Sequence, residues 1–457
     1  MRIPRGHVWV LSIMLLVALA GAAILAYRTS EGINVILITV DTLRADHLGA
    51  YGYPRDTSPN LDAFAKESIL FLKAFSQSSE TNPSLSSLMT SYLPTETRVL
   101  NNRFALQDGA VTLAELLRTR GYRTGAVVSN FSLRQGSGFE QGFDAYDDKV
   151  TDRHQTEWEG LERFAPNTTK AALRWLEANG GSKFFLWVHY MDPHYPYLPP
   201  PPYNTMFTDA PLGEDKWLPF NEEGTGLGGI HSAAQLGERH ELQFYVSQYD
   251  GEVRFFDQYL GELLQTIRAK GLMKNTLVIL AADHGEGMGE HNYYFAHHEF
   301  LYQSVIHVPL LVRFPDQRLG GHSMSYPVAN TDIVPTVLET LGMDVPNTMR
   351  GRNLLSPGDR NIYAMASYRG RKSALIAGDR KLIEDADRTQ FYDLARDASE
   401  QRNLAETDPD GDFTAAAKLK QRLAELENED RLALGVPGEW NIDEGSTRKL
   451  KALGYVQ

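Results

Sequence analysis

Two acidic residues stand directly after long apolar runs, where a buried strand would end. Asp41 follows Asn34–Val40, and Asp283 follows Thr276–Ala282 and opens the motif Asp283-His284-Gly285-Glu286. A carboxylate at a strand end can ligate a hard cation through oxygen, and an aspartate beside a histidine suits Ca²⁺, Mn²⁺ or Zn²⁺. Asp41 alone could equally cap a helix. Together, the two motifs predict a site for a divalent metal.

Two histidines are candidates for contact with a substrate. His189 lies near the end of the apolar run Phe184–Tyr190 and His194 follows it, whereas the pair His297-His298 belongs with the second aspartate motif. A histidine at a strand exit can hydrogen-bond the oxygens of an anion or protonate a leaving group near neutral pH. The alternative, a ring held by local backbone, is stronger for His194 than for His189.

A turn dense in hydroxyl groups, residues 79–90, leads into a predicted helix. The unpaired N–H groups and the positive dipole end of a helix N-terminus favour an arriving anion. A metal at the same place would lower the pKa of a hydroxyl group further. From this segment alone, plain capping of the helix by serine and threonine is the preferred interpretation.

Helical patterns alternate with apolar runs along most of the chain, which predicts a large, mostly parallel sheet with helices on both faces. In open α/β sheets, ligands bind outside the carboxyl ends of the strands, where Asp41, His189 and Asp283 fall. The proline-rich stretch 195–217 and the glycine-rich stretch 221–237 are expected to be loops, either a lid or a solvated crossing. The alternating segments are 34–40, 60–66, 112–119, 124–129, 169–178, 184–190, 242–269, 276–282 and 308–314.

The elements become shorter from about residue 360. Runs at 362–366, 374–377 and 381–384, followed by a helical pattern at 414–428, predict a smaller C-terminal α+β subdomain with an antiparallel sheet. We therefore expect three parts, which are an N-terminal segment (1–30), a catalytic domain (31–358) and the C-terminal subdomain (359–457).

The composition excludes several classes of protein. A content of 42% hydrophobic and 23% charged residues is that of an ordinary globular protein. A net charge of −13, with no clustered lysine and arginine, argues against a nucleic-acid partner. The absence of cysteine removes disulfides, thiolate metal sites and a cysteine nucleophile.

The N-terminus predicts export. Residues 8–27 carry no charge and are numerous enough to span a bilayer. Arg2 and Arg5 precede them, which places the N-terminus in the cytoplasm and the rest of the chain outside. Ala18-Leu19-Ala20 offers a cleavage pattern, so a removable signal competes with the retained anchor that the length of the run favours. We expect an extracytoplasmic protein at the periplasmic face of the inner membrane, anchored by this helix, or secreted if the signal is cleaved.

Motifs along the chain also follow the order of a known family. They are Asp41, Thr81-Asn82-Pro83-Ser84, His189, Asp283-His284, Leu301-Tyr302, Ile306-His307-Val308-Pro309, Arg380-Lys381-Leu382-Ile383, Phe391-Tyr392-Asp393-Leu394 and Glu400-Gln401-Arg402-Asn403-Leu404. Over about residues 33–405 the chain resembles the sulfatases of the alkaline phosphatase superfamily. The resemblance implies that fold, a divalent metal on Asp41, Asp283 and His284, and Thr81 in the nucleophile position. It also implies that His189 and His298 contact the anionic ester, and His194 and His297 are further candidates for binding it.

Several positions depart from the family pattern. A cysteine, or sometimes a serine, that becomes formylglycine usually begins the nucleophile turn, with an arginine four residues later, whereas this chain has Thr81 and Leu85. Threonine cannot form that aldehyde, so the formylglycine mechanism is excluded. Thr42 stands where a second aspartate often follows the first metal ligand, and His298 stands where a lysine is expected.

A threonine in this position resembles that of phosphoethanolamine and phosphoglycerol transferases, which form a covalent phospho-enzyme. We therefore expect a metal-dependent hydrolase of sulfate or phosphate esters, phosphate mildly favoured, that uses Thr81 and one Ca, Mn, Mg or Zn ion. The expected substrate is an anionic ester on a glycan, a lipid headgroup or a small molecule. Two alternatives stay open, a transferase of that kind and a catalytically silent member that binds an anion.

Overall fold

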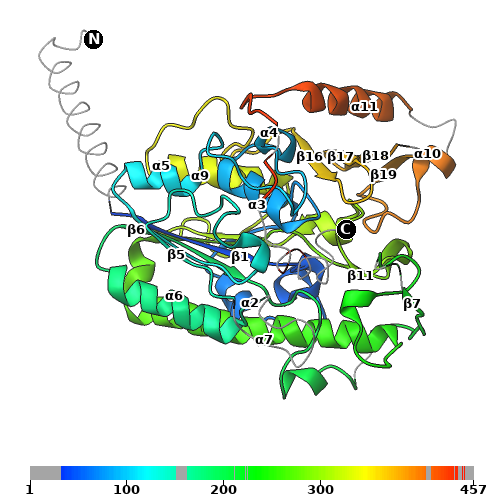
Figure 1. The fold of residues 1–457 in the computed structure, drawn as a ribbon, viewed down its shortest axis with the longest axis horizontal. Helices are drawn as coiled ribbons and strands as arrows, with labels where there is room; N and C mark the ends of the chain where they lie inside the picture. The colour runs from blue at the N-terminus through cyan, green and yellow to red at the C-terminus, as the bar shows by residue number, and fades with distance from the viewer. Residues whose placement is uncertain are drawn as a thin grey trace, which may run out of the picture.

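The computed structural model describes residues 32–150, 162–209, 212–221, 223, 225–386, 388–407, 413–436, 438–440, 445 and 447 (Figure 1). Within these ranges no helix combines the length and the apolar character needed to cross a membrane. The predicted membrane segment, residues 8–27, lies outside the described residues. Its role as an anchor or a cleaved signal therefore stays a prediction.

An eight-stranded sheet forms the centre of the structure. From β9 through β1, β6 and β4 to β5 all neighbours are parallel, whereas β13 runs antiparallel to both β9 and β2. The sheet is therefore mostly parallel, as the sequence predicts. In spatial order its strands are β14 (Ser323–Met324), β2 (Ile69–Phe71), β13 (Leu310–Arg313), β9 (Thr276–Ala282), β1 (Asn34–Val40), β6 (Phe184–Tyr190), β4 (Arg123–Val127) and β5 (Ala145–Asp147).

Helices cover both faces of this sheet. Helices α6 and α7 lie together on one face, and α3, α5 and α9 lie on the other (Figure 1). Every residue of β1, β6 and β9 is buried, because a central strand between two helical layers meets no water on either side. The helices are α2 (Pro59–Ala65), α3 (Thr81–Thr90), α4 (Pro94–Thr97), α5 (Leu113–Thr119), α6 (Ala165–Asn179), α7 (Leu242–Ala269), α8 (Gln303–Ile306), α9 (Ile333–Thr340), α10 (Leu404–Thr407) and α11 (Phe413–Asn428).

The structure divides two segments differently from the sequence prediction. The apolar run 308–314 contains Pro309, which cannot donate a ladder hydrogen bond, and the chain there forms two separate strands, β12 (His307–Val308) and β13. β12 joins β3 (Ala74–Phe75) and β15 (Val328–Ala329) in a three-stranded sheet. The predicted loop 221–237 contributes β8 (Ile230–His231) and the last residue of β7 (Phe220–Asn221). β8 pairs with β7 and with β11 (Tyr294–Ala296), and β11 pairs with β10 (Gly287–Met288). Strands of two residues have no periodicity for a sequence pattern to reveal.

The C-terminal subdomain is a four-stranded antiparallel sheet that α11 packs against (Figure 1). Three of its strands match the predicted runs, and the sequence analysis did not assign β19. The strands are β16 (Asn361–Ala366), β17 (Lys372–Ala377), β18 (Arg380–Glu384) and β19 (Thr389–Asp393).

A buried ion pair within this subdomain is joined to the catalytic domain by a hydrogen bond from Gln303. Lys381 Nζ lies 2.6 Å from Glu400 Oε1, both side chains are fully buried, and Gln303 N at the start of α8 donates to Glu400 Oε2 at 2.6 Å. We expect Lys381→Met to lower the free energy of unfolding by about 3–5 kcal/mol, because Glu400 is left buried and uncompensated. Urea unfolding measures this loss. The double variant Lys381→Met/Glu400→Gln should recover much of it, and equal losses in the two proteins would contradict the explanation.

Candidate active site

The C-terminal ends of three neighbouring strands lie together. β1 lies between β6 and β9, with Thr39 opposite His189 and Val40 opposite Ala282. Asp41 and Asp283 therefore leave neighbouring strands side by side, and His189 lies at the end of the third. All three side chains are fully buried. The predicted convergence at the carboxyl edge of the sheet is confirmed.

Asp41, Asp283 and His284 form a compact set of possible metal ligands. One ligand atom from each lies within 4.8 Å of the others. His284 Nε2 is 3.7 Å from Asp41 Oδ1 and 3.7 Å from Asp283 Oδ2. Two carboxylate oxygens and an imidazole nitrogen are a donor set suited to a divalent cation.

The hydrogen bonds around these three residues fit a bound cation. Asp41 Oδ1 and Asp283 Oδ2 are buried and have no hydrogen-bond partner among the described residues, which is costly for a carboxylate. His284 Nδ1 lies 3.0 Å from Gly285 O, so we assign the proton to Nδ1 and direct the Nε2 lone pair at the carboxylates. A cation between them would satisfy all three groups.

The two carboxyl groups differ in their electrostatic surroundings. Burial and the charge of Asp41 raise the pKa of Asp283 well above its usual value. For Asp41 the opposing effect of burial is outweighed by neighbouring histidines, His189 first, and the pKa is lowered to about 2. Like charges held this close in a buried site require a positive partner for both to ionise.

Thr81 is the first residue of α3, at the N-terminus of a ten-residue helix. Its Oγ1 lies 3.4 Å from His284 Nε2, and its side chain is fully buried. Ser84 Oγ, one turn along the helix, donates to Asp283 O at 2.5 Å and so ties the helix to the strand end. Asn102 Oδ1 accepts from Asn82 N at 2.8 Å. The Thr81 hydroxyl therefore faces His284 at the positive end of a helix dipole.

Three histidines gather beside this centre. The rings of His297 and His284 lie 4.5 Å apart, those of His297 and His298 lie 4.0 Å apart, and those of His297 and His194 lie 5.1 Å apart. Burial lowers the pKa of all three, most for His297 and His298, which favours neutral rings. A neutral imidazole still offers one N–H to an anion. His297 Nδ1 lies 3.1 Å from Glu286 Oε1, which orients that ring.

His189 lies on the far side of Asp41. Its Nδ1 is 2.9 Å from Thr39 Oγ1, and its Nε2 is 3.7 Å from Asp41 Oδ2. Trp187 Nε1 donates to the same Thr39 hydroxyl at 2.8 Å, which fixes the arrangement. The ring is placed to support Asp41, and direct contact of His189 with a substrate stays a prediction.

The structure adds residues that the sequence analysis did not select. Asn130 Nδ2 donates to Asp41 Oδ2 at 2.6 Å, and Glu286 holds His297. His231, from β8, lies with its ring 5.3 Å from that of Tyr195. Glu286 belongs to the second aspartate motif, and Asn130 follows β4. Both therefore lie just after a strand, which is the pattern that selected Asp41 and Asp283. His231 lies in a predicted loop, where no pattern distinguishes it.

Comparison with known proteins identifies the family of this chain. The model of the family named Sulfatase matches residues 33–343, and that of the N-sulphoglucosamine sulphohydrolase C-terminal region matches residues 289–429. The chain belongs to the sulfatase family. The resemblance inferred from its motifs is thereby confirmed, and this sulfatase-family protein is a member of a group of ester-hydrolysing enzymes.

Curated relatives of this sulfatase-family protein include two sulfatases and a multifunctional member of the alkaline phosphatase superfamily. An ulvan-active sulfatase of Formosa agariphila is 25% identical over 70% of this chain and 64% of its own length, so the match spans somewhat less than two thirds of that relative. Iduronate 2-sulfatase of Homo sapiens is 26% identical over 73% of this chain and 68% of its own. The multifunctional alkaline phosphatase superfamily protein PehA of Trinickia caryophylli is 25% identical over 70% and 76%.

Solved structures share the fold. The phosphonate monoester hydrolase of Agrobacterium radiobacter superposes with a TM-score of 0.70 at 22% identity, over 86% of this chain and 95% of its own. A protein solved with its substrate D-glucosamine-2-N,6-O-disulfate superposes with a TM-score of 0.72 at 20% identity, over 88% and 100%. The predicted α/β architecture is confirmed.

Proposed function

We propose that this sulfatase-family protein hydrolyses a phosphate or sulfate ester, with phosphate favoured, through Thr81 as nucleophile. The observation that carries the proposal is the position of Thr81 Oγ1. It begins α3 and lies 3.4 Å from His284 Nε2, beside Asp41 and Asp283. A hydroxyl group at a helix N-terminus, next to a metal site, is suited to nucleophilic attack on an anionic centre.

Asp41, Asp283 and His284 would hold one divalent ion, Ca, Mn, Mg or Zn. When bound, such an ion supplies Lewis-acid stabilisation of negative charge and lowers the pKa of a nearby hydroxyl group. The chain supplies the remaining functions. Oγ1 of Thr81 attacks phosphorus in line with the leaving oxygen. The bond from phosphorus to the alcohol oxygen breaks, and the proton that Thr81 gives up is transferred to that oxygen, so the alcohol leaves neutral.

The histidine cluster acts on the transferred group. His298 donates an N–H to its oxygens. His194 and His297, whose Nδ1 atoms lie 2.6 Å from Tyr195 O and 3.1 Å from Glu286 Oε1, donate from Nε2 when the arriving anion favours the protonated rings. Water then attacks phosphorus, the bond to Thr81 breaks, and inorganic phosphate is released while Thr81 recovers its proton. An acceptor alcohol in place of water would make the protein a transferase.

Phosphate is favoured because of the chemistry of threonine. A formylglycine hydrate releases sulfate by reforming its aldehyde, and Thr81 has no such route. The relatives include a multifunctional member of the alkaline phosphatase superfamily as well as sulfatases, and the fold is shared with a phosphonate monoester hydrolase. The glycan-directed relatives support an anionic ester on a sugar as one class of substrate.

The experiment that tests the proposal compares matched chromogenic sulfate monoesters, phosphate monoesters, phosphate diesters and phosphonate monoesters with the full chain and added Mn²⁺, Ca²⁺, Mg²⁺ or Zn²⁺. Phosphoester turnover above sulfate turnover is expected. Dominant sulfate turnover would overturn the preference. Metal binding without turnover would favour the transferase if an acceptor alcohol restores the reaction, and the silent anion-binding protein if it does not.

Asn130 provides a test of the metal site that does not need a substrate. Its amide donates to Asp41 Oδ2 at 2.6 Å. We expect Asn130→Ala to weaken metal binding by about 10–100-fold, the usual effect of removing a group that orients a ligand. Calorimetric titration of the metal-free protein measures this. Asn179→Ala, at the end of α6, is the matched control, and an unchanged dissociation constant in the Asn130 variant would contradict the assigned role.

Export completes the proposal. The basic N-terminus and the apolar residues 8–27 favour a catalytic domain outside the cytoplasm, held at the inner membrane or released by cleavage. Fractionation of cells that produce the full chain distinguishes the membrane-bound from the released form. Activity confined to the cytoplasm would contradict both.

A further inference from the structure

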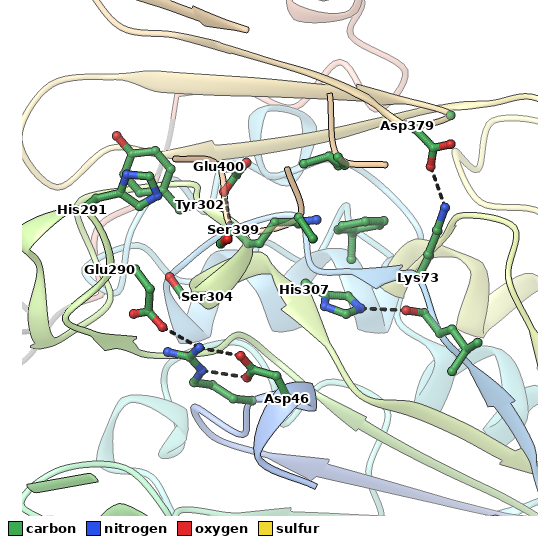
Figure 2. A pocket seen from close by; sticks show the side chains of 17 residues that line it. Asp46, Lys73, Glu290, His291, Tyr302, Ser304, His307, Asp379, Ser399 and Glu400 are labelled. Atoms are coloured by element: carbon green, nitrogen blue, oxygen red, sulfur yellow. Dashed lines mark hydrogen bonds and ion pairs between the residues drawn. The ribbon is translucent and has the colours of Figure 1, made fainter. Parts of the chain in front are cut away.

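A second cavity, of about 440 Å³, lies between the catalytic domain and the C-terminal subdomain (Figure 2). None of the site residues predicted from the sequence lines it. Its walls come from the turn after β1, from β3, from the segment between β10 and β12, and from the turns of the C-terminal sheet. Its volume is within the range of small-molecule sites, about 300–1,000 Å³.

The charges in this interdomain cavity are already paired. Arg44 makes 2.7 Å contacts with both Asp46 and Glu290, and Lys73 Nζ lies 2.6 Å from Asp379 Oδ1 (Figure 2). Among the described lining residues these are the only arginine and lysine, and acidic side chains outnumber them. A sulfate or phosphate group would therefore meet no spare cation. The electrostatics favour an uncharged ligand, in contrast to the active site.

Hydrogen-bond acceptors are in excess along the walls. Gln303 Oε1 is buried and has no partner among the described residues. A carboxylate has about four lone-pair sites, so Asp46 and Glu290 can still accept hydrogen bonds while paired with Arg44. Ser304 lines the interior. The matching ligand is rich in hydroxyl donors.

The cavity also presents flat and apolar surface. The His291 ring stacks on Tyr302, with centroids 3.6 Å apart and planes 10° apart (Figure 2). His291 has φ of 55°, a left-handed conformation that a non-glycine residue keeps only when its surroundings hold it there. Leu72 and Phe75 add apolar wall. Sugar rings have this dual character, because their C–H faces pack on aromatic rings while their hydroxyl edges bond planar polar side chains.

We propose that the interdomain cavity binds an uncharged sugar unit, a monosaccharide or disaccharide, at a site distinct from the ester-cleaving centre. The site is independent of Thr81 chemistry and exists whether the ester cleaved is a sulfate or a phosphate. Arg44 also donates from Nη1 to Glu286 O, so the loop 284–291 carries a metal ligand at one end and a cavity wall at the other. Because this loop connects the two sites, sugar binding is measured directly and not through its effect on turnover.

Saturation-transfer NMR on the full chain, with glucose, galactose, mannose, xylose, cellobiose and lactose as probes, tests the site. At least one sugar should bind saturably, with a dissociation constant of about 1 mM or below. Ser399 is exposed at the rim, so Ser399→Trp should fill the cavity without disturbing the core and weaken binding by about tenfold or more. Ser182→Trp, the same change at an exposed turn before β6, should have no effect.

Two further variants distinguish sugar binding in the interdomain cavity from binding at the active site. Gln303→Ala should weaken sugar binding without filling any space, and Thr81→Ala should leave sugar binding unchanged. Absence of saturable binding for all six sugars would overturn the proposal. So would binding that survives Ser399→Trp, or binding that inorganic phosphate displaces, since phosphate would compete at the ester site.

Discussion

Replacing Thr81 with alanine is expected to lower kcat by at least about 10⁴-fold, about 5.5 kcal/mol of transition-state stabilisation. Oγ1 is the atom that forms the covalent bond, and the neighbouring Ser84 hydroxyl is engaged with Asp283 O at 2.5 Å, so it cannot replace Thr81. Stopped assays with a chromogenic phosphate ester measure the loss. The melting temperature should change little, because alanine is a good helix former at the first position of α3.

Thr81→Ser is the matched control, since it keeps the hydroxyl group and removes only a methyl group. It should retain measurable turnover and, quenched during the reaction, show a mass increase of one phosphoryl group. Ser79→Ala tests another hydroxyl group of the same turn, whose Oγ is buried without a partner among the described residues. Full activity in Thr81→Ala together with loss in Ser79→Ala would reassign the nucleophile.

The elements that carry the site could be predicted from the sequence because their burial is uniform. β1 and β9 are buried at every residue, so each appears as an unbroken apolar run, and the residue after each run is a metal-ligand candidate. α7, with 28 residues, is long enough for its period to fix both ends, and its predicted bounds agree with the structure. Local pattern was therefore sufficient to bring Asp41 and Asp283 together.

Residues that support the site from a distance could not be predicted in this way. Asn130 meets Asp41 across 89 positions of sequence, and Asn102 meets Asn82 from a loop, so both contacts exist only once the sheet has formed. His231 is placed by β8, which pairs with β7 at two positions, His231 opposite Asn221, and with β11 at one. The interdomain cavity depends on how two sheets dock, a feature that no periodicity reports.

Asp283→Asn is expected to reverse the order of stability between variant and wild type when metal is added. In the metal-free protein, the amide keeps an oxygen for Thr42 N and His284 N and turns an N–H towards Asp41 Oδ1, which removes the cost of holding a second carboxyl group, either charged or protonated, beside the buried Asp41 carboxylate. The variant should then be more stable than wild type by about 1–3 kcal/mol. At a metal concentration of about 1,000 times the dissociation constant, wild type should gain about 4 kcal/mol and the variant almost nothing.

Thermal unfolding with a chelator and then with Mn²⁺ or Zn²⁺ measures both halves of this reversal. Asp257→Asn is the matched control, because Asp257 is also fully buried and also accepts backbone N–H bonds, from Asn60 at 3.0 Å and Leu61 at 2.8 Å, but belongs to the contact of α2 with α7. It should leave the gain from metal unchanged. An equal gain in Asp283→Asn would place the ion elsewhere. The prediction of a more stable variant rests on the like charges that a metal site holds close together. If the variant without metal is instead less stable than wild type, the Asp283 carboxylate stabilises the fold and is not there to bind a cation.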